Sequence, residues 1–271
     1  GFVRSVRRHA CSPVAGRAMT LDGLQPSILL PAFAAGLLVL ASHVPLGMEV
    51  LRRGIIFIDL AIAQIAGLGI VIASTLGFEV NGWRTQLSAV IAALAGALCL
   101  RWMEKKNPAH LEAVIGVSFV AAACAAIVLM SHDPHAGEHL QELLVGQILW
   151  TTWAGLLPLA LITAGVLVAW FGLRLKNSPL GFYQLFAITI TASVQVVGVY
   201  LVFASLIVPA LVSGGRLRRA YALGAAGYAL GLLASGLFDL PAGAAIVLAL
   251  ILVAVASVAA SGAVMTPRKN P

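Results

Sequence analysis

Long apolar runs, separated by short polar segments, constrain the fold of this chain more than any other feature. A helix needs roughly 20 apolar residues to cross the hydrocarbon of a bilayer. We expect such spans, one of them short, at residues 28–45, 55–77, 85–103, 111–131, 146–173, 183–203, 204–213, 219–238 and 241–263. With 61% hydrophobic and 10% charged residues, the chain cannot cover a soluble surface. The sequence therefore predicts an all-α polytopic membrane protein of about eight or nine transmembrane segments, including one short or re-entrant segment near Pro209.

The beginning of the chain differs from the rest. Residues 1–18 are polar, carry four arginines and contain no apolar core long enough for a signal peptide. Met19 offers a second start. We therefore interpret residues 1–18 as a non-native or upstream extension, and residues 19–271 as a single transmembrane domain, because the spans leave no room for a soluble one.

Basic residues after Met19 gather in alternate loops, with Arg84 as the exception. They are Arg52 and Arg53; Arg101, Lys105 and Lys106; Arg174 and Lys176; Arg216, Arg218 and Arg219; and Arg268 and Lys269. By the positive-inside rule these loops are cytoplasmic and the N-terminus is outside. The net charge of +7 is therefore interpreted as topology, with no nucleic-acid partner. This scheme requires residues 183–213 to cross the membrane and return.

One loop is rich in metal-binding residue types. It lies between the fourth and fifth spans and reads SHDPHAGEHLQE, residues 131–142. The candidate ligands are His132, Asp133, His135, Glu138 and His139. Imidazole with carboxylate suits Zn(II) and, with more oxygen, Mn(II). The alternative is a solvated polar turn.

Polar residues also interrupt two of the apolar runs. Asp59 and Gln64 lie in the second run, and Gln195 and Pro209 lie in the stretch ASVQVVGVYLVFASLIVPA. Ionisable and helix-breaking residues at such places usually face protein or a wet cavity. We take all four as candidates for a translocation path. The alternatives are that Asp59 pairs with Arg52 or Arg53, and that the second stretch is an ordinary membrane helix.

Three stretches resemble the membrane permeases of zinc and manganese ABC importers, the ABC-3 type. They are residues 192–210 with the order Q-V-V-G, L-V, A, L-I, P-A; residues 51–69 with a Leu-Arg-Arg turn followed by Asp59; and residues 132–150 with a Leu-x-G-x-Ile/Leu motif. The sequence departs from the family at Ala63, where members typically have a histidine. Similarity extends over residues 44–212.

The resemblance implies a permease subunit, without tightly bound cofactor, that is dimeric about a central path in a bacterial plasma (inner) membrane. It implies two further partners, an extracytoplasmic metal-binding protein and a cytoplasmic ATP-binding subunit. The chain has no G-x-x-x-x-G-K-[ST] phosphate loop, so we expect a transport subunit and not an enzyme. Zinc is the first choice of transported ion and manganese the second.

The family's ATPase-coupling segment is reduced here to GLRLKNSPLGFYQ, residues 172–184. Its candidate coupling residues are Arg174, Lys176, Leu180 and Gly181, unless another basic loop docks. Two other functions stay open at the level of sequence. One is a secondary metal or ion transporter that uses Asp59, and the other is a membrane metal-sensing or assembly protein that uses only the outer loop.

Overall fold

The computed structural model describes residues 25–79, 82–106, 108–130, 146–173, 175 and 178–261, which are helical and contain no strand. The helices are α1 (Pro26–Arg53), α2 (Ile58–Thr75), α3 (Trp83–Lys106), η2 (Pro108–His110), α4 (Leu111–Leu129), η3 (Ile148–Trp150), α6 (Trp153–Leu167), η4 (Val168–Gly172), α7 (Pro179–Val197), α8 (Val199–Val212), α9 (Leu217–Phe238) and α10 (Ala242–Ser261). Within these residues, 8 helices are long and apolar enough to cross a membrane. The predicted all-α polytopic class is confirmed.

The short segment near Pro209 is also confirmed, but its boundary differs from the prediction. The chain breaks at Gly198, not between residues 203 and 204, and Gly198 separates α7 from α8 with φ 80° and ψ 161°. Glycine adopts this backbone conformation without the clash that a Cβ would cause. Pro209 lies inside α8. At 14 residues, α8 is about 21 Å long, which is less than the hydrocarbon thickness.

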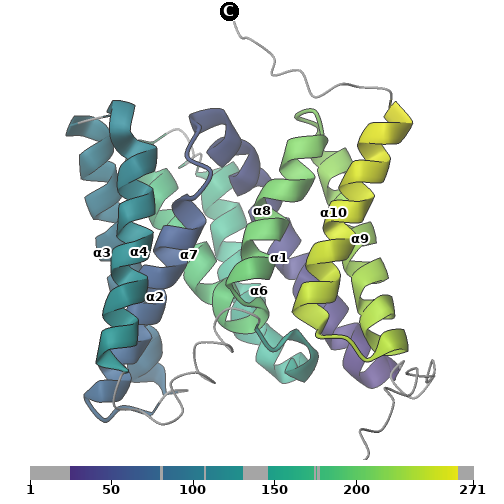
Figure 1. Cartoon of the computed structure of the whole chain (residues 1–271), viewed down its shortest axis with the longest axis horizontal. Coiled ribbons are helices and arrows are strands. Elements are labelled where there is room, and N and C mark those ends of the chain that lie inside the picture. Colours follow the sequence, from purple (N-terminus) through teal and green to yellow (C-terminus); the bar gives the residue numbers. More distant parts are fainter. Residues whose placement is uncertain are drawn as a thin grey trace, which may run out of the picture.

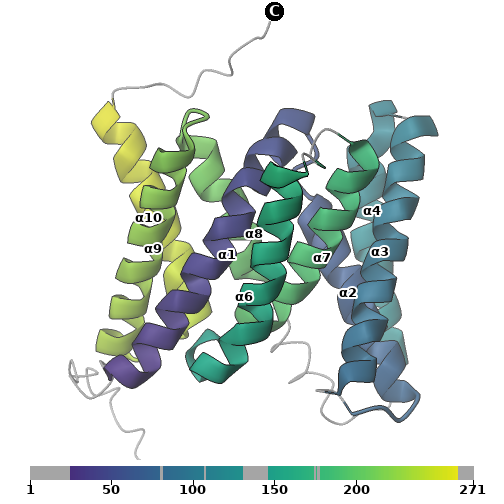
Figure 2. The same cartoon turned by 180° about the vertical axis from the view of Figure 1, so that it is seen from behind.

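The ends of the helices separate the charges as the sequence predicts. In Figures 1 and 2, α1 and α3 end, and α7 and α9 begin, at the end of the bundle that also holds the end of α10. We call this the basic end. There Arg53 of α1 lies 4.0 Å from Glu104 of α3. Arg84 is the second residue of α3, which begins at the opposite end.

The helices form two groups with α7 between them. On one side α2 packs on α3 and α4; on the other α1 packs on α8 and α9, and α10 packs on α8 and α9 (Figures 1 and 2). Small residues permit the closest approaches, as is usual where lipid removes the hydrophobic drive for association. Gly47 of α1 is one of them, since a Cβ there would overlap the backbone carbonyl of Leu206 in α8.

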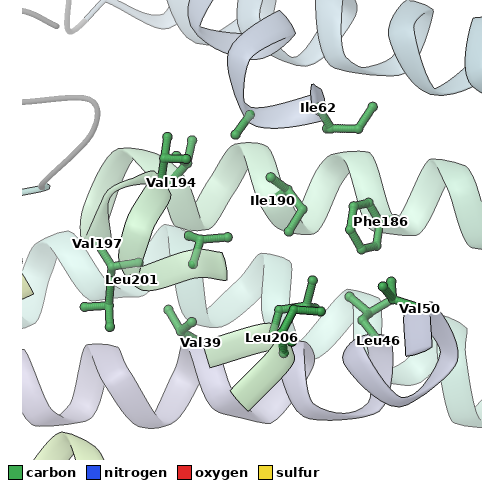
Figure 3. Packing of buried hydrophobic residues seen from close by; sticks show 14 of the residues in the cluster. Val39, Leu46, Val50, Ile62, Phe186, Ile190, Val194, Val197, Leu201 and Leu206 are labelled. Carbon is green, nitrogen blue, oxygen red and sulfur yellow. The ribbon is translucent and has the colours of Figure 1, made fainter. Parts of the chain in front are cut away.

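The apolar core lies where α1, α7 and α8 meet. Figure 3 shows Val39, Leu46 and Val50 of α1 facing Leu201 and Leu206 of α8, with α7 alongside. Ile62 of α2 reaches the same cluster beside α7. The broken pair α7–α8 is thus the structural centre of the chain.

Candidate translocation site

The break between α7 and α8 is covered by the segment that follows the histidine-bearing loop. Gly146 has φ 71°, and a Cβ on it would overlap backbone atoms of Val197 and Gly198. Ile148 of η3 is 2% exposed and packs into the main core. The backbone after the loop is therefore fixed directly on the break. Sequence reasoning noticed this glycine only as part of the Leu-x-G-x-Ile/Leu motif and did not assign it a role.

Asp59 lies in the first turn of α2 and is 1% exposed. Neither carboxylate oxygen makes a well-formed hydrogen bond within the described residues, and the donors close to it are the backbone N–H groups of Asp59 and Leu60. An acidic residue in a first helical turn is favoured by the helix dipole. A buried carboxylate without a strong partner is nevertheless costly, and in membrane proteins such a group usually marks a functional site.

The alternative reading of Asp59, as a partner of the neighbouring arginines, is wrong. Both arginines pair with Glu49 instead. Arg52 Nε donates to Glu49 Oε2 at 2.8 Å, and Arg53 Nε donates to Glu49 Oε1 at 2.7 Å. The spacings i,i+3 and i,i+4 along α1 make these pairs local. Asp59 is left without a counter-charge from that turn.

The start of α2 lies beside the middle of α8. The rings of Phe57 and Phe203 stack at a centroid distance of 6.3 Å with 4° between their planes. Ala63, at the position where the family typically has a histidine, is 3% exposed and offers no ligand atom. Asp59 is not the only carboxylate at this turn, because Oε1 of Glu112 in α4 accepts a hydrogen bond from the Phe57 N–H at 3.4 Å. In the described part of the chain, no group of three or more His, Cys, Asp or Glu side chains is arranged to hold a metal ion.

The other sequence candidates do not join Asp59 in one cluster. Gln64 and Gln195 are half-buried, and neither bonds to the Asp59 carboxylate. Pro209 is buried within α8. Because proline lacks an N–H, it leaves the Ser205 carbonyl without its usual helical donor. The Ser205 hydroxyl pairs with the Tyr228 hydroxyl of α9 at 2.8 Å, which ties this part of α8 to its neighbour.

Two candidates of the coupling segment lie at the start of α7. Ser178 caps this helix by accepting a hydrogen bond from the Gly181 N–H at 3.4 Å, and Pro179 occupies a first-turn position that suits it. Leu180 is 44% exposed at the basic end. Gly181 is buried, and a Cβ there would press on the Leu175 carbonyl.

The remaining predicted residues lie outside the described residues. They are the loop ligands His132, Asp133, His135, Glu138 and His139, and the coupling candidates Arg174 and Lys176. The roles predicted for these residues are therefore not tested by the structure.

Among the buried polar residues that the sequence analysis did not single out, His43 is the ionisable one in the described part of the chain. His43 lies in α1 with no exposed surface; its Nδ1 is 2.8 Å from the Val39 carbonyl, and its Nε2 has no partner among the described residues. Its location inside the first span, between Ser42 and Val44, was the available signal. A histidine in an apolar span belongs to the same class of expensive intramembrane groups as Asp59.

A bundle of apolar helices long enough to cross a bilayer, with a broken pair at its centre, defines a multi-pass membrane protein. The chain matches the family model of the ABC 3 transport family over residues 25–177 and 167–261, and it belongs to that family. The predicted family is therefore confirmed. The family is one of membrane transport subunits, in agreement with the expected role as a transport subunit.

Two solved structures share the fold. The first, described as PsaBC from Streptococcus pneumoniae in complex with Fab, has 21% identity and a TM-score of 0.66 over 88% of this chain and 94% of that chain. The second, described as an inward-facing conformation of a metal-chelate type ABC transporter, has 14% identity and a TM-score of 0.52 over 92% of this chain and 84% of that chain. At these identities the likeness establishes the arrangement of helices and leaves the transported substrate to be argued separately.

Proposed function

We propose that the chain is the permease subunit of an ABC importer for a divalent transition metal, with zinc as the first candidate and manganese as the second. Asp59 carries this proposal, because a buried carboxylate without a strong partner, beside the central helix pair, is a group that a passing cation would neutralise. Membership in the ABC 3 transport family supports the role of a transport subunit.

The proposed importer has two copies of the chain around a central path in a bacterial plasma (inner) membrane. The basic end faces the cytoplasm, as the positive-inside rule requires. An ATP-binding subunit docks there on the coupling segment, residues 172–184. This segment contains Arg174, Lys176 and Leu180, and Leu180 is exposed.

An extracytoplasmic binding protein delivers the metal at the opposite end. His132, His135 and His139, with Asp133 and Glu138, take up the ion transiently before it passes inward. Gly146, which follows the loop in sequence, packs against the backbone of Val197 and Gly198, so the segment after the loop contacts the α7–α8 break. Transport requires binding that is strong enough for entry and weak enough for release.

The test is metal uptake by cells that lack their own importers and express the chain with its ATP-binding subunit and binding protein. Asp59→Asn keeps the side-chain shape and removes the charge. We expect uptake at low external zinc or manganese to fall about tenfold or more, the size of effect typical of losing one supporting group at a metal site. Glu79→Gln, at an exposed carboxylate, is the control and should leave uptake unchanged. Parental uptake in Asp59→Asn would refute the role of Asp59.

A secondary transporter that uses Asp59 is the second candidate, because an unpaired intramembrane carboxylate also suits ion-coupled transport. Metal uptake measured without the ATP-binding subunit distinguishes the secondary transporter from the ABC importer. Uptake that continues without it would favour the secondary transporter. A metal-sensing or assembly protein would show no uptake with any combination of subunits.

A further inference from the structure

We propose that Arg53 connects the ATPase-coupling segment at the start of α7 to helices α1 and α3, and that it does so as an exchangeable link. The inference rests on the proposed function, because it assigns a role to this arginine in an importer driven by a separate ATP-binding subunit. It concerns a positioning residue and not a group that touches the transported ion.

Three helices meet at the Arg53 side chain. Arg53 is the last residue of α1, and its side chain is 15% exposed. Nε donates to Glu49 of the same helix at 2.7 Å, and Nη1 lies 4.0 Å from Oε1 of Glu104 in α3. The guanidinium carbon lies 4.2 Å from the ring centroid of Phe182 in α7. A single side chain thus contacts the ends of α1 and α3 and the start of α7.

Phe182 contacts aromatic residues on both sides of the connection between α6 and α7. It directly follows Gly181 in α7 and is fully buried. Its ring centroid lies 6.3 Å from that of Trp170 in η4, before the connection, and 5.6 Å from that of Phe186, after it. A movement of the connection therefore reaches the ring on which Arg53 stacks.

The Arg53 side chain can break its ion pairs without leaving a carboxylate unpaired. Glu49 is also held by Arg52, and Glu104 is also held by Arg101 at 2.7 Å. Removing one partner from a half-buried pair normally leaves an unpaired charge, which is what makes such pairs costly to break. Here each acid has a second arginine, so the Arg53 contacts can break and reform at low cost. A link with two available arrangements is what coupling between distant sites requires.

Arginine is suited to this place and lysine is not. The planar guanidinium stacks on an aromatic ring while its N–H groups still reach carboxylates that lie in the plane of the guanidinium. Lysine carries the same charge on a compact ammonium and cannot make both contacts in this geometry. Arg53→Lys therefore removes the link and keeps the charge of the basic end.

The experiment measures coupling in lipid nanodiscs that contain the permease with its ATP-binding subunit. ATP hydrolysis is recorded with and without the metal-loaded binding protein, and metal transported per ATP is recorded in vesicles. The variants are Arg53→Lys and Phe182→Leu. Arg52→Lys is the matched control, because the Arg52 side chain is 69% exposed and its ion pair is with Glu49 in its own helix.

We expect Arg53→Lys and Phe182→Leu to assemble with the ATP-binding subunit as the parent does and to keep the basal hydrolysis rate. Stimulation by the loaded binding protein should fall about fivefold or more, the lower range of typical coupling between sites. Metal transported per ATP should fall with it, and Arg52→Lys should match the parent. A purely structural role for Arg53 would instead lower assembly and basal hydrolysis together.

Parental stimulation in Arg53→Lys would overturn the inference alone. Loss of assembly in Arg53→Lys would overturn it in favour of a docking or structural role. A parent protein that shows no stimulation by any metal-loaded binding protein would overturn the proposed importer, and the inference with it.

Discussion

At the scale of single residues, Gly146 is restricted both by its backbone conformation and by its surroundings. Its positive φ and its contact with the backbone of Val197 and Gly198 exclude a side chain. Gly146→Ala should therefore destabilise the protein by more than the roughly 1–2 kcal/mol that a left-handed conformation costs an L-residue. Thermal unfolding in detergent measures the effect, and the midpoint should fall by several degrees.

Gly116→Ala is the matched control for this substitution. Gly116 is a helical glycine of α4, and a Cβ there would meet nothing within 4 Å. Alanine in a helix interior is more favourable than glycine by roughly 0.5–1 kcal/mol, so the control should unfold at the parental temperature or higher. Equal behaviour of the two variants would show that the contact between Gly146 and the break adds nothing to stability.

Some contacts around Asp59 could be predicted from the spacing of residues along one helix, and others could not. The importance of this carboxylate follows from its place in an apolar run. Its lack of an arginine partner could also have been predicted, because Glu49 precedes Arg52 and Arg53 by three and four residues on one helix. The stacking of Phe57 on Phe203 could not, since it joins residues far apart in sequence.

At the scale of elements, α8 depends on its neighbour α9. The Ser205 hydroxyl donates to the Leu201 carbonyl at 2.6 Å and pairs with the Tyr228 hydroxyl at 2.8 Å, one turn before Pro209 interrupts the helical hydrogen bonds. Tyr228→Phe should lower the free energy of unfolding by about 0.6–1 kcal/mol, the usual value of such a bond between membrane helices. A double-mutant cycle with Ser205→Ala isolates the pair.

Tyr200→Phe is the control for Tyr228→Phe. Tyr200 belongs to the same helix pair but is 54% exposed, so loss of its hydroxyl should change stability little. A zero coupling energy in the cycle would mean that Ser205 and Tyr228 find equally good partners elsewhere.

The α7–α8 pair was predicted from charge, and its boundary was not. By the positive-inside rule, the three arginines after this pair must lie on the same side of the membrane as the other basic loops. They are Arg216, Arg218 and Arg219, so the chain had to cross the membrane and return within residues 183–213. The break itself was expected between residues 203 and 204, before a short segment that contains Pro209. The structure puts it at Gly198, because glycine adopts the φ of 80° and ψ of 161° found there without the clash of a Cβ, and because α8 accommodates Pro209.

At the scale of the whole molecule, the gathering of basic residues at one end predicts the orientation in the membrane. Reporters fused after Lys106, Lys176 or Arg219 should be cytoplasmic, and reporters fused after Trp83 or within residues 133–139 should be outside. Alkaline phosphatase and green fluorescent protein fusions provide complementary measurements. A cytoplasmic result for residues 133–139 would exclude metal capture by the loop and reverse the proposed direction of delivery.

The close contact of Gly47 with the Leu206 carbonyl limits how the protein can move. Sliding of α1 along α8 would bring a side chain against the Leu206 carbonyl that Gly47 now faces, so we expect the two helices to move together. Between α2 and α7, by contrast, the contact is made by branched and aromatic side chains such as Ile62, Ile190 and Phe186 (Figure 3), which can change rotamer. We therefore expect a shear displacement during the transport cycle at the surface shared by α2 and α7, and not between α1 and α8.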